Sequence, residues 1–419
     1  LMDLLTVATA GSVDDGKSTL IGRLLLEADA VADDQLAAAA EVSRRRGDDV
    51  TDLSLFTDGL RAEREQAITI DVAHRYFGTA QRRFILADTP GHAEYTRNMV
   101  TGASRADVGL VLVDVRHGLT EQSRTHLAML ALLRVPHLVI ALNKMDLVDW
   151  SRAIVREMHG ELTAYSRKLA AAGLAPAAPT VIPVSALTGD NVTSPSARTP
   201  WYVGPTLLSH LEGLVVPDRA SGPLRLPIQL TLRPRRGDPN SAREYAGQLA
   251  SGALAVGDQV VVLPRGHSTT ITGVAVPGRA VSEAGSPQSV SVTLADDLDV
   301  TRGDLIVHPD DLPTVTQDLR ARIAWLHSEP LRPGVRVLVK HTTRAVKAIV
   351  REVSDRLDIS TLARIESPDA LRCNDIGMVS IRLAEPLIVD PYAVNRHTGG
   401  FILIREDSGE TLGAGMVSA

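Results

Sequence analysis

The stretch Gly11–Thr19 combines two glycines, a lysine and hydroxyl groups at a spacing that suits phosphate chemistry. It reads Gly-Ser-Val-Asp-Asp-Gly-Lys-Ser-Thr and fits the phosphate-loop pattern G-x-x-x-x-G-K-[ST]. The glycines let the backbone curl until its N–H groups point inward at the positive end of a helix dipole. Lys17 would reach the β- and γ-phosphates, and the Ser18 hydroxyl would ligate Mg²⁺. The predicted phosphate-binding residues are Gly11, Ser12, Val13, Asp14, Asp15, Gly16, Lys17, Ser18 and Thr19.

The plainer interpretation of this stretch is a glycine-rich turn without a ligand. It is disfavoured by composition, because only five of the 44 basic residues are lysines and one of them occupies the required position. The flanking residues also fit, since the apolar run Leu4–Ala10 precedes the loop and the helical pattern Leu20–Leu26 follows it.

A second stretch, Asp88-Thr-Pro-Gly91, follows the strand-like run Phe84–Ala87. A carboxylate at a strand end can hold the Mg²⁺ shell, and a glycine three residues on can donate its backbone N–H to a γ-phosphate. The pattern is short, and a tight turn explains it equally well. We predict that Asp88 takes part in metal binding and that Gly91 senses the γ-phosphate.

The third stretch, Asn143-Lys-Met-Asp146, suits a purine base. The Asp146 carboxylate can accept from the paired N–H groups on the Watson–Crick edge of guanine, which adenine lacks, so this residue would select GTP over ATP. Asn143 would bond the other edge of the base, and the stem of Lys144 would cover its face. Taken alone, the stretch could equally be a charged turn before a helix.

The fourth stretch, Ser185-Ala186-Leu187, ends the run Thr180–Val184, and its backbone N–H could reach the guanine carbonyl oxygen. By itself it is almost uninformative. In this order and spacing, however, the four stretches predict a Mg²⁺-dependent GTP-binding switch domain.

Each of these stretches follows an apolar run short enough to be a buried strand, and helical patterns such as Gln122–Leu133 and Ser151–Ala172 lie between the runs. This alternation predicts an α/β domain with a mostly parallel sheet and helices on both faces, whose ligands bind at the carboxyl ends of the strands. The predicted strands are Leu4–Ala10, Phe84–Ala87, Val108–Val113, Leu138–Leu142 and Val181–Val184. Residues 27–66 do not fit the alternation, and we expect a mobile, partly helical insertion there.

The pattern changes after the turn-rich segment Val216–Pro223. Short β runs separated by turns favour barrels, because two small β domains need closed or protected edges. The predicted runs are Leu226–Leu232, Tyr245–Leu249, Gln259–Leu263, Val290–Leu294 and Asp304–Val307, followed after Pro309–Pro313 by a further β-rich block. We therefore predict a G domain at 1–215, a β-barrel at 224–310 and a second β-barrel at 318–419.

Composition excludes several other classes of protein. The net charge of −6 gives no general attraction to nucleic acid or acidic lipid, and the single Cys373 excludes an intrachain disulfide or a multi-cysteine metal site. No apolar stretch approaches a membrane span and no secretory signal is recognisable, so we expect a cytoplasmic protein without a membrane or nucleic-acid partner. The twelve histidines show no metal-ligand spacing, and no tightly held zinc or iron is expected.

In this order the four stretches resemble the elongation-factor-Tu-like class of translation-factor GTPases, and the resemblance spans the chain as one G domain and two β-barrels. It implies that Glu65–Asp71 is the first switch, in which Thr69 closes on Mg²⁺ and the γ-phosphate. It also implies that His92 orients the attacking water, with Val13 and Ile68 as the hydrophobic gate that His92 must pass. Phosphoryl transfer needs an aligned water more than a strong base, which suits histidine. The predicted catalytic residues are thus Lys17, Thr69, Gly91 and His92, and the predicted metal ligands are Ser18, Thr69 and Asp88.

Within that class, Asp15 stands where translation factors usually carry histidine. The Asp-Asp form of the loop, with Ser18–Leu24 after it, resembles the large, GTP-hydrolysing subunit of bacterial sulfate adenylyltransferase. Thr57–Gln66, Asp88–Met99 and the ending Gly413–Val417 agree with that resemblance.

This resemblance implies a division of labour in sulfate assimilation. A separate small catalytic ATP-sulfurylase subunit, in a heterodimer or higher oligomer, would join ATP and sulfate to give adenosine 5′-phosphosulfate and pyrophosphate. The transfer is strongly uphill because the product is a mixed anhydride, and GTP hydrolysis on this chain would make it proceed. Adenylylsulfate kinase is a further partner to consider. No second G-x-x-x-x-G-K-[ST] occurs after Thr19, so kinase activity is not expected within these residues, and a longer fused gene stays an open alternative.

One departure and two rival functions complete the predictions. The family usually has glycine where this chain has Ala67, and we hypothesise that Ala67 alters the balance between switch states while nucleotide binding survives. A translation factor that delivers aminoacyl-tRNA is one rival, slightly supported by Arg233-Pro-Arg-Arg236, and a purely regulatory GTPase is the other.

Overall fold

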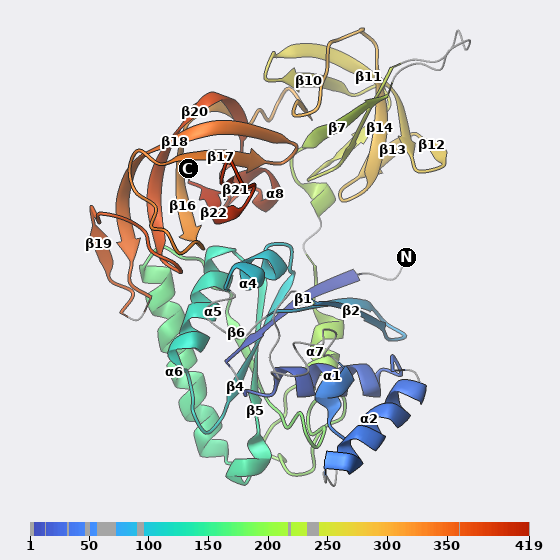
Figure 1. Cartoon of the computed structure of the whole chain (residues 1–419). Helices are drawn as coiled ribbons and strands as arrows, with labels where there is room; N and C mark the ends of the chain where they lie inside the picture. Colours follow the sequence, from blue (N-terminus) through green and yellow to red (C-terminus); the bar gives the residue numbers. More distant parts are fainter. Residues whose placement is uncertain are drawn as a thin grey trace. The chain divides into compact units, whose positions relative to one another are not determined.

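The computed structural model describes residues 4–12, 14–31, 33–46, 51–56, 73–89, 96–216, 219–232, 243–359 and 361–418. Contacts divide the chain into two compact units, Leu1–Val216 with Ile359–Ala363 and Pro217–Asp358 with Arg364–Ala419. The first unit is the α/β part of the chain, and the second unit holds both β-rich blocks (Figure 1).

The first unit alternates strands and helices, as its sequence pattern predicts. Its described strands are β1 (Leu4–Gly11), β2 (Ala73–Gly78), β3 (Arg83–Asp88), β4 (Val108–Asp114), β5 (His137–Asn143) and β6 (Pro179–Pro183). Its described α-helices are α1 (Lys17–Glu27), α2 (Asp33–Arg46), α4 (Thr96–Ala103), α5 (Glu121–Leu132), α6 (Arg152–Ala171) and α7 (Leu207–Gly213). Two 3-10 helices, η1 (Leu53–Phe56) and η3 (Met145–Val148), also lie within the described residues of this unit.

These strands form one sheet in the order β2-β3-β1-β4-β5-β6. All neighbours from β3 to β6 are parallel, and only the edge strand β2 is antiparallel, with Ala73 opposite Asp88. Every residue of the central strand β4 is buried, which is typical of a parallel strand covered on both faces. The predicted mostly parallel sheet is therefore confirmed.

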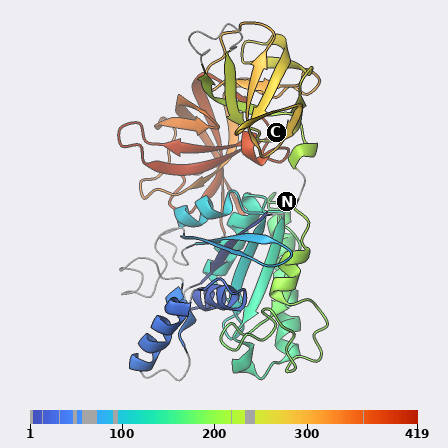
Figure 2. The same ribbon diagram turned by 90° about the vertical axis from the view of Figure 1, so that its right-hand side faces the viewer.

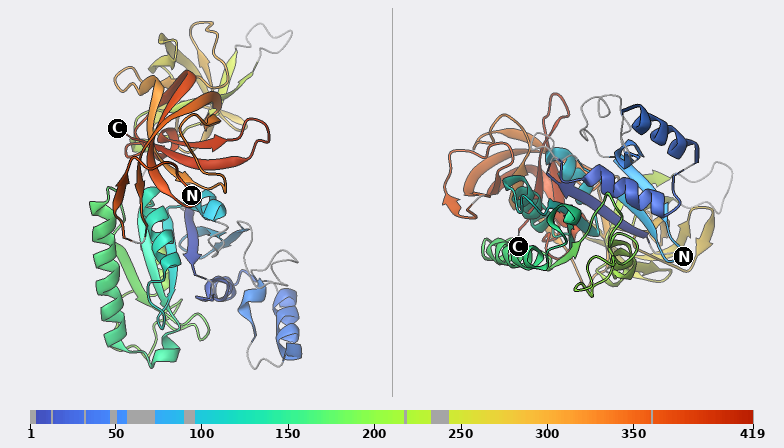
Figure 3. Two further views of the ribbon diagram at one scale, coloured as in Figure 1. Left: turned by 60° about the vertical axis from the view of Figure 1, so that its left-hand side comes forward. Right: turned by 90° about the horizontal axis from the view of Figure 1, so that it is seen from below.

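Helices cover this sheet and leave the carboxyl ends of its strands to the loops. The side chains Leu20, Leu24, Leu207 and Leu211 from α1 and α7 share one hydrophobic cluster with the strands, while α4 and α5 contact β1. The long helix α6 lies along the sheet beside β6 (Figure 3). The fold thus gathers the segments after β1, β3, β4 and β5 at one edge of the sheet.

The insertion predicted at residues 27–66 is partly helical where the structure describes it, with α2 and η1 joined to irregular residues. α2 lies at the periphery of the unit, and η1 contacts both α1 and α2 (Figure 2). Gly22 makes the approach to η1 possible, because a Cβ on this residue would lie 2.1 Å from the carbonyl oxygen of Leu53. Residues 57–66 of the predicted insertion lie outside the described residues.

The second unit contains two closed β structures. The described strands of the first are β7 (Leu226–Leu232), β8 (Glu244–Gln248), β9 (Ala253–Ala255), β10 (Gln259–Leu263), β11 (His267–Val276), β12 (Arg279–Val281), β13 (Glu283–Gly285), β14 (Ser289–Leu294) and β15 (Leu305–Val307). The described strands of the second are β16 (Thr314–Trp325), β17 (Arg336–His341), β18 (Arg344–Leu357), β19 (Arg364–Glu366), β20 (Ile376–Val389), β21 (Gly400–Ile404) and β22 (Thr411–Val417). The short helices η4 (Arg219–Ser221) and α8 (Arg396–Gly399) complete the described elements of this unit.

Strand pairing closes each β block into a barrel. In the first block the order β10-β15-β7-β8-β14-β11 returns on itself through the β10–β11 pair, and in the second block β17-β21-β22-β16-β20-β18 returns through the β17–β18 pair. Closure leaves these strands without free edges, which was the physical reason for predicting barrels. Each barrel encloses its own hydrophobic cluster, one around Tyr245 and Ile306 and the other around Trp325 and Leu403. The predicted G domain followed by two barrels is confirmed.

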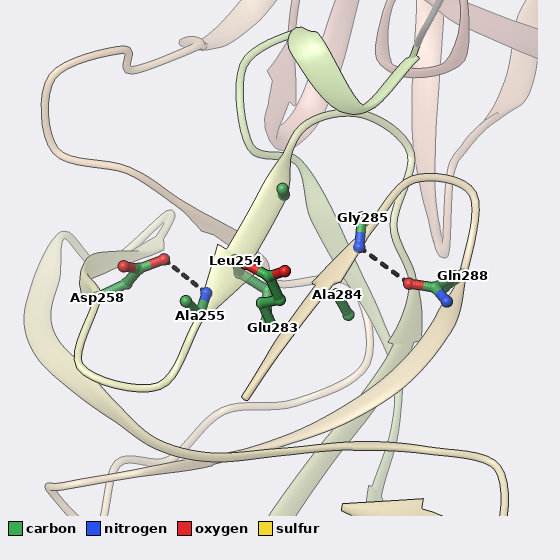
Figure 4. A pocket seen from close by; sticks show the side chains of 8 residues that line it. Leu254, Ala255, Asp258, Glu283, Ala284, Gly285 and Gln288 are labelled. Carbon is green, nitrogen blue, oxygen red and sulfur yellow. Dashed lines mark hydrogen bonds between the residues drawn. The ribbon is translucent and has the colours of Figure 1, made fainter. Parts of the chain in front are cut away.

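The first barrel carries a shallow hollow of about 420 Å³ between β9 and β13 (Figure 4). Two polar side chains at its rim are occupied with local turns. Asp258 accepts a hydrogen bond from the backbone N–H of Ala255 at 2.7 Å, and the Gln288 side chain accepts one from Gly285 at 3.0 Å. These bonds give the two side chains a structural role.

Candidate nucleotide-binding site

The loop between β1 and α1 adopts a left-handed turn at its second glycine. Gly16 precedes α1 with φ 88° and ψ 27°, a conformation that L side chains rarely adopt. A Cβ on Gly16 would also lie 2.4 Å from the side-chain nitrogen of Asn143. The backbone conformation and the close approach of Asn143 therefore both require glycine at this position. The motif alone does not reveal the second requirement.

Lys17 brings the first two predicted stretches together. Its side chain is buried in the first turn of α1, and its ammonium group donates to the backbone oxygen of Thr89 and lies 3.4 Å from Asp88 Oδ1. Asp88 is 2% exposed and also accepts from Thr9 Oγ1 at 3.2 Å. The lysine and the predicted metal-binding carboxylate therefore share one point at the ends of β1 and β3.

The chemistry of this point suits Mg²⁺. Ser18 supplies a hydroxyl oxygen from the same first turn of α1, and Asp88 supplies a carboxylate, which are the hard oxygen ligands that Mg²⁺ prefers alongside phosphate oxygens. Within the described residues no group of three or more histidine, cysteine or acidic side chains could hold a metal by itself. A site of this kind depends on oxygens of the bound phosphates.

Asn143 connects the phosphate loop to the fourth stretch. Its side-chain nitrogen donates to the backbone oxygen of Asp15 at 2.7 Å, and its side-chain oxygen accepts from the backbone N–H of Ala186 at 2.9 Å. One amide hydrogen and one lone pair are left by these bonds, so a contact with the base edge is still chemically possible. The structure thus adds a bridging role that the sequence did not predict for this residue.

The end of β5 presents the predicted base-binding residues. Lys144 has φ 65°, and its ammonium group donates to the backbone oxygen of Asp14. Asp146 is half-buried in η3, and its negative charge adds to the hydrogen bond with Asp114 in raising the pKa of the Arg116 guanidinium. Lys144 therefore contacts the phosphate loop, and the roles of Lys144 and Asp146 in binding the base stay predictions.

The Ser185–Leu187 turn is held to α1 from behind. Ser185 and Ala186 are buried, whereas the Leu187 side chain is 51% exposed. Arg23 donates through Nε to the Ala186 oxygen at 3.2 Å and through its terminal nitrogen to the Leu187 oxygen. Arg23, which sequence reasoning did not assign to the site, fixes the backbone that is predicted to reach guanine.

Asp114 contacts the predicted site residue Lys144 and also Arg116, and the sequence prediction included neither Asp114 nor Arg116. Asp114 ends β4, between the strands that carry the phosphate loop and the Asn143–Asp146 stretch. Burial alone would raise the pKa of its carboxyl, but hydrogen bonds from Arg116 and Lys144 hold the pKa well below its usual range. The signal in the sequence was an acidic residue at the end of a buried apolar run, the same pattern that identified Asp88.

A set of hydroxyl groups supports the loop from the start of α5. Ser12 Oγ lies 2.6 Å from Thr120 Oγ1, and Thr120 Oγ1 lies 2.9 Å from Ser123 Oγ while accepting from the Ser123 N–H. The Asp15 carboxylate accepts from the backbone N–H of Ser12 at 2.8 Å, and burial raises the pKa of Asp15. These contacts join the phosphate loop to the neighbouring helix through side chains that its motif leaves unspecified.

His126 is a further buried group on α5. Burial, with a smaller contribution from the nearby positive charge of Lys17, lowers the pKa of His126 to about 3, so the ring is neutral near pH 7. In the part of the chain that the structure describes, no partner is found for its buried Nδ1. The histidine lies near the loop, and its neutral state avoids placing a second charge against Lys17.

Several predicted residues lie outside the described residues. They are Val13 in the phosphate loop, Ala67, Ile68 and Thr69 in the predicted switch, and Gly91 and His92 after Asp88. Their roles stay predictions. Among the described residues, no helix is long and apolar enough to cross a membrane.

Comparison with known proteins adds family information to this geometry. Residues 2–230 match the elongation factor Tu GTP binding domain, and residues 318–418 match the GTP-eEF1A C-terminal domain-like family. The chain is 51% identical to the bifunctional enzyme CysN/CysC of Mycobacterium tuberculosis (strain ATCC 25618 / H37Rv). The alignment spans 416 residues, which are 99% of this chain and 67% of that protein.

Two further relatives carry the name sulfate adenylyltransferase subunit 1. The protein from Teredinibacter turnerae is 42% identical over 99% of this chain and 87% of its own length. The protein from Aeromonas hydrophila is 44% identical over 99% of this chain and 86% of its own length. These relatives favour the sulfate adenylyltransferase interpretation over a translation factor that binds aminoacyl-tRNA.

Proposed function

The chain belongs to the sulfate adenylyltransferase subunit 1 family and has an elongation-factor-Tu-type GTP-binding domain, and from this premise we propose that it couples GTP hydrolysis to sulfate activation. The chemical step that it drives is the transfer of an adenylyl group from ATP to sulfate on a separate small ATP-sulfurylase subunit. The products of that step are adenosine 5′-phosphosulfate and pyrophosphate. The proposal needs a heteromeric assembly, with this chain as its GTP-hydrolysing member.

The observation that carries the proposal is the convergence of three other predicted stretches on the phosphate loop. Lys17 contacts Thr89 and lies beside Asp88, Asn143 bridges Asp15 and Ala186, and Lys144 contacts Asp14. Residues more than 100 positions apart in the chain thus surround the loop at the strand ends, where ligands of α/β sheets bind. A glycine-rich turn without a ligand would not require this arrangement.

Each group in the pocket has a task in binding. The backbone of residues 11–19 would hold the phosphates at the N-terminus of α1, and Lys17 would neutralise charge on the β- and γ-phosphates. Ser18 and Asp88 would hold Mg²⁺, which would supply positive charge against the phosphates. Asp146 would accept the two N–H groups that distinguish guanine from adenine.

Hydrolysis requires that a water molecule be aligned with the γ-phosphate. We assign this positioning to His92, and the sensing of the γ-phosphate to Thr69 and Gly91, on the family resemblance. The contacts of these residues would differ between the state with the γ-phosphate and the state without it. That difference is the physical means by which hydrolysis on this chain could change the state of a partner.

The deciding experiment is adenosine 5′-phosphosulfate synthesis by the reconstituted pair of this chain and the small subunit. With ATP and sulfate held constant, GTP is expected to raise product formation, and a non-hydrolysable GTP analogue is expected to fail. The variant Lys17→Met tests whether the effect needs this pocket. Equal product formation with and without GTP, while GTP is still hydrolysed, would leave a regulatory GTPase and overturn the coupling.

A further inference from the structure

Asp114 lies at the meeting point of the phosphate loop and the base-binding stretch. Its side chain is 1% exposed at the carboxyl end of β4, which pairs with β1 on one side and with β5 on the other. In these pairs Asp114 is level with Asn143, directly before Lys144. None of the motifs that predict nucleotide binding includes this residue.

The Asp114 carboxylate holds two cationic side chains at once. Oδ2 lies 3.0 Å from the ammonium of Lys144 and 2.6 Å from the guanidinium of Arg116. Oδ1 accepts from Arg116 twice, from Nε at 3.0 Å and from the backbone N–H at 2.9 Å. His117 Nδ1 lies further away, 3.7 Å from Oδ2. A fork-to-fork contact of this kind fixes direction as well as distance.

The side chains of the two cations are more exposed than that of the acid. The Lys144 side chain is 24% exposed and that of Arg116 is 42% exposed, against 1% for Asp114. Lys144 continues to the backbone oxygen of Asp14 in the phosphate loop, and Arg116 lies close enough to Asp146 for their charges to attract. The buried acid therefore anchors two partly exposed cationic side chains.

We infer that Asp114 is a positioning residue for the base, which holds Lys144 over the nucleotide and keeps Arg116 from closing on Asp146. The inference rests on the proposed binding of guanine nucleotides by this pocket, and it adds a determinant of affinity and base selectivity outside the recognised motifs.

Two physical arguments support the two parts of this role. A lysine side chain has a flexible stem, and an anchored ammonium loses less conformational freedom when a base is placed against that stem. An arginine fork matches a carboxylate in two-pronged geometry, so an unrestrained Arg116 would compete with guanine for Asp146. Asp114 limits the conformational freedom of Lys144 by binding its ammonium group. It limits the competition of Arg116 for Asp146 by occupying Nε and one terminal nitrogen of Arg116.

The first test is Asp114→Asn in the full chain, measured by displacement of a fluorescent GDP analogue by GDP and by ADP in magnesium buffer. Loss of the charged anchor is expected to weaken GDP binding by roughly tenfold or more, and ADP binding much less, so selectivity falls. Asp107→Asn is the matched control, because Asp107 is also buried and lies just before the opposite end of β4, where it accepts from the Thr6 N–H at 3.0 Å. This control is expected to leave the ratio of GDP affinity to ADP affinity unchanged. Asp114→Ser serves in the same assay if circular dichroism shows that Asp114→Asn is unfolded.

The second test is a cycle of Asp114→Asn with Lys144→Met and with Arg116→Gln. If Asp114 acts through Lys144, the double variant loses little more GDP affinity than Lys144→Met alone. If Asp114 also restrains Arg116, Arg116→Gln restores part of the affinity that Asp114→Asn loses. Wild-type GDP affinity retained by a folded Asp114 variant, or losses that simply add, would overturn the inference. Failure of the wild-type chain to prefer GDP over ADP would instead overturn the proposed function.

Discussion

Two buried ion clusters in this chain use the same chemical groups with opposite arrangements. In the nucleotide-binding unit, the carboxylate of Asp114 is buried and its cationic partners Lys144 and Arg116 are partly exposed. In the barrel unit, the cation is buried instead, because Arg225 is 1% exposed and meets the acidic side chains Asp390 and Asp311.

The barrel cluster leaves the arginine no capacity for a further ligand. The five N–H groups of a guanidinium have five acceptors here. Nε and one terminal nitrogen of Arg225 reach the two carboxylate oxygens of Asp390, each at 2.9 Å. The remaining contacts go to Asp311 Oδ1 at 3.3 Å, to the Asp311 backbone oxygen at 3.0 Å and to the Leu224 oxygen at 2.9 Å. Such a cluster joins the first barrel to the second within their compact unit.

The difference between the two clusters distinguishes buried ion pairs with a structural role from those with a role in binding. A cluster in which the central ion is fully paired holds structure together, and it has no group left for recognition. In the other kind of cluster, a buried ion anchors exposed ions of the opposite sign, and those exposed ions can contact a ligand.

Arg225→Met should destabilise the barrel unit by about 3–5 kcal/mol, because it leaves the buried Asp390 carboxylate without its cationic partner. Chemical denaturation followed by circular dichroism gives the free energy of unfolding. The control is Arg382→Met, which removes an exposed pair with Asp318 and should cost less than about 1 kcal/mol. GDP affinity should be unchanged in both folded variants. A loss below 1 kcal/mol for Arg225→Met would break the assignment of this cluster to structure.

Asp146→Asn should weaken GDP binding by about 2 kcal/mol, because a charged acceptor for two guanine N–H groups is lost. Asparagine offers an N–H group in its place, so xanthosine diphosphate, which carries an oxygen at that position, should bind better than it does to the wild type. Competition with a fluorescent nucleotide measures both effects, and stability should change little because Asp146 is half-buried. Unchanged GDP affinity in the variant, or xanthosine diphosphate bound no better than by the wild type, would contradict the predicted role.

Thr120→Ala should cost about 1 kcal/mol of stability, because Thr120 caps α5 by accepting from the Ser123 N–H. Thr206→Ala removes the equivalent cap of α7, where Thr206 accepts from Ser209, and should cost about the same. Only Thr120 also contacts Ser12 of the phosphate loop, at 2.6 Å. GDP affinity should therefore fall in Thr120→Ala alone, and an equal fall in both variants would remove the hydroxyl set from the site.

Asp15 and Asp114 should give opposite dependences of stability on pH. The pKa of Asp15 is raised from 3.8 by burial, so its contribution is fully present below 3.8 and is lost as pH rises through the raised pKa. The pKa of Asp114 is lowered, so its contribution is present above 3.8 and is lost only as pH falls further. Between about pH 4 and pH 8, the stability of wild type relative to Asp15→Asn should fall with rising pH, while that relative to Asp114→Asn should stay nearly constant. A flat difference for Asp15→Asn would contradict this assignment.

Much of the fold follows from local sequence patterns. The predicted runs Leu226–Leu232 and Gln259–Leu263 coincide with β7 and β10, and Ser151–Ala172 differs from α6 by one residue at each end. The short edge strand β2 and the long strand β11 were not predicted. Residue types in Ala73–Gly78 do not alternate between apolar and polar, although more buried and exposed residues alternate in the folded strand, and its place is decided by pairing with β3.

For the site, residue types and their spacing are enough to predict the chemistry of the phosphate loop and of the base-selecting carboxylate. Glycine geometry, a lysine at fixed spacing and the acceptor groups of an aspartate act within a few residues, so their pattern can be read without the fold. Tertiary structure alone decided that Asn143 bridges two loops, that Arg23 braces the Ser185–Leu187 turn and that Asp114 anchors Lys144 and Arg116. Those roles depend on which strands lie side by side and on which side chains are excluded from water, and both are set by packing between residues far apart in the chain.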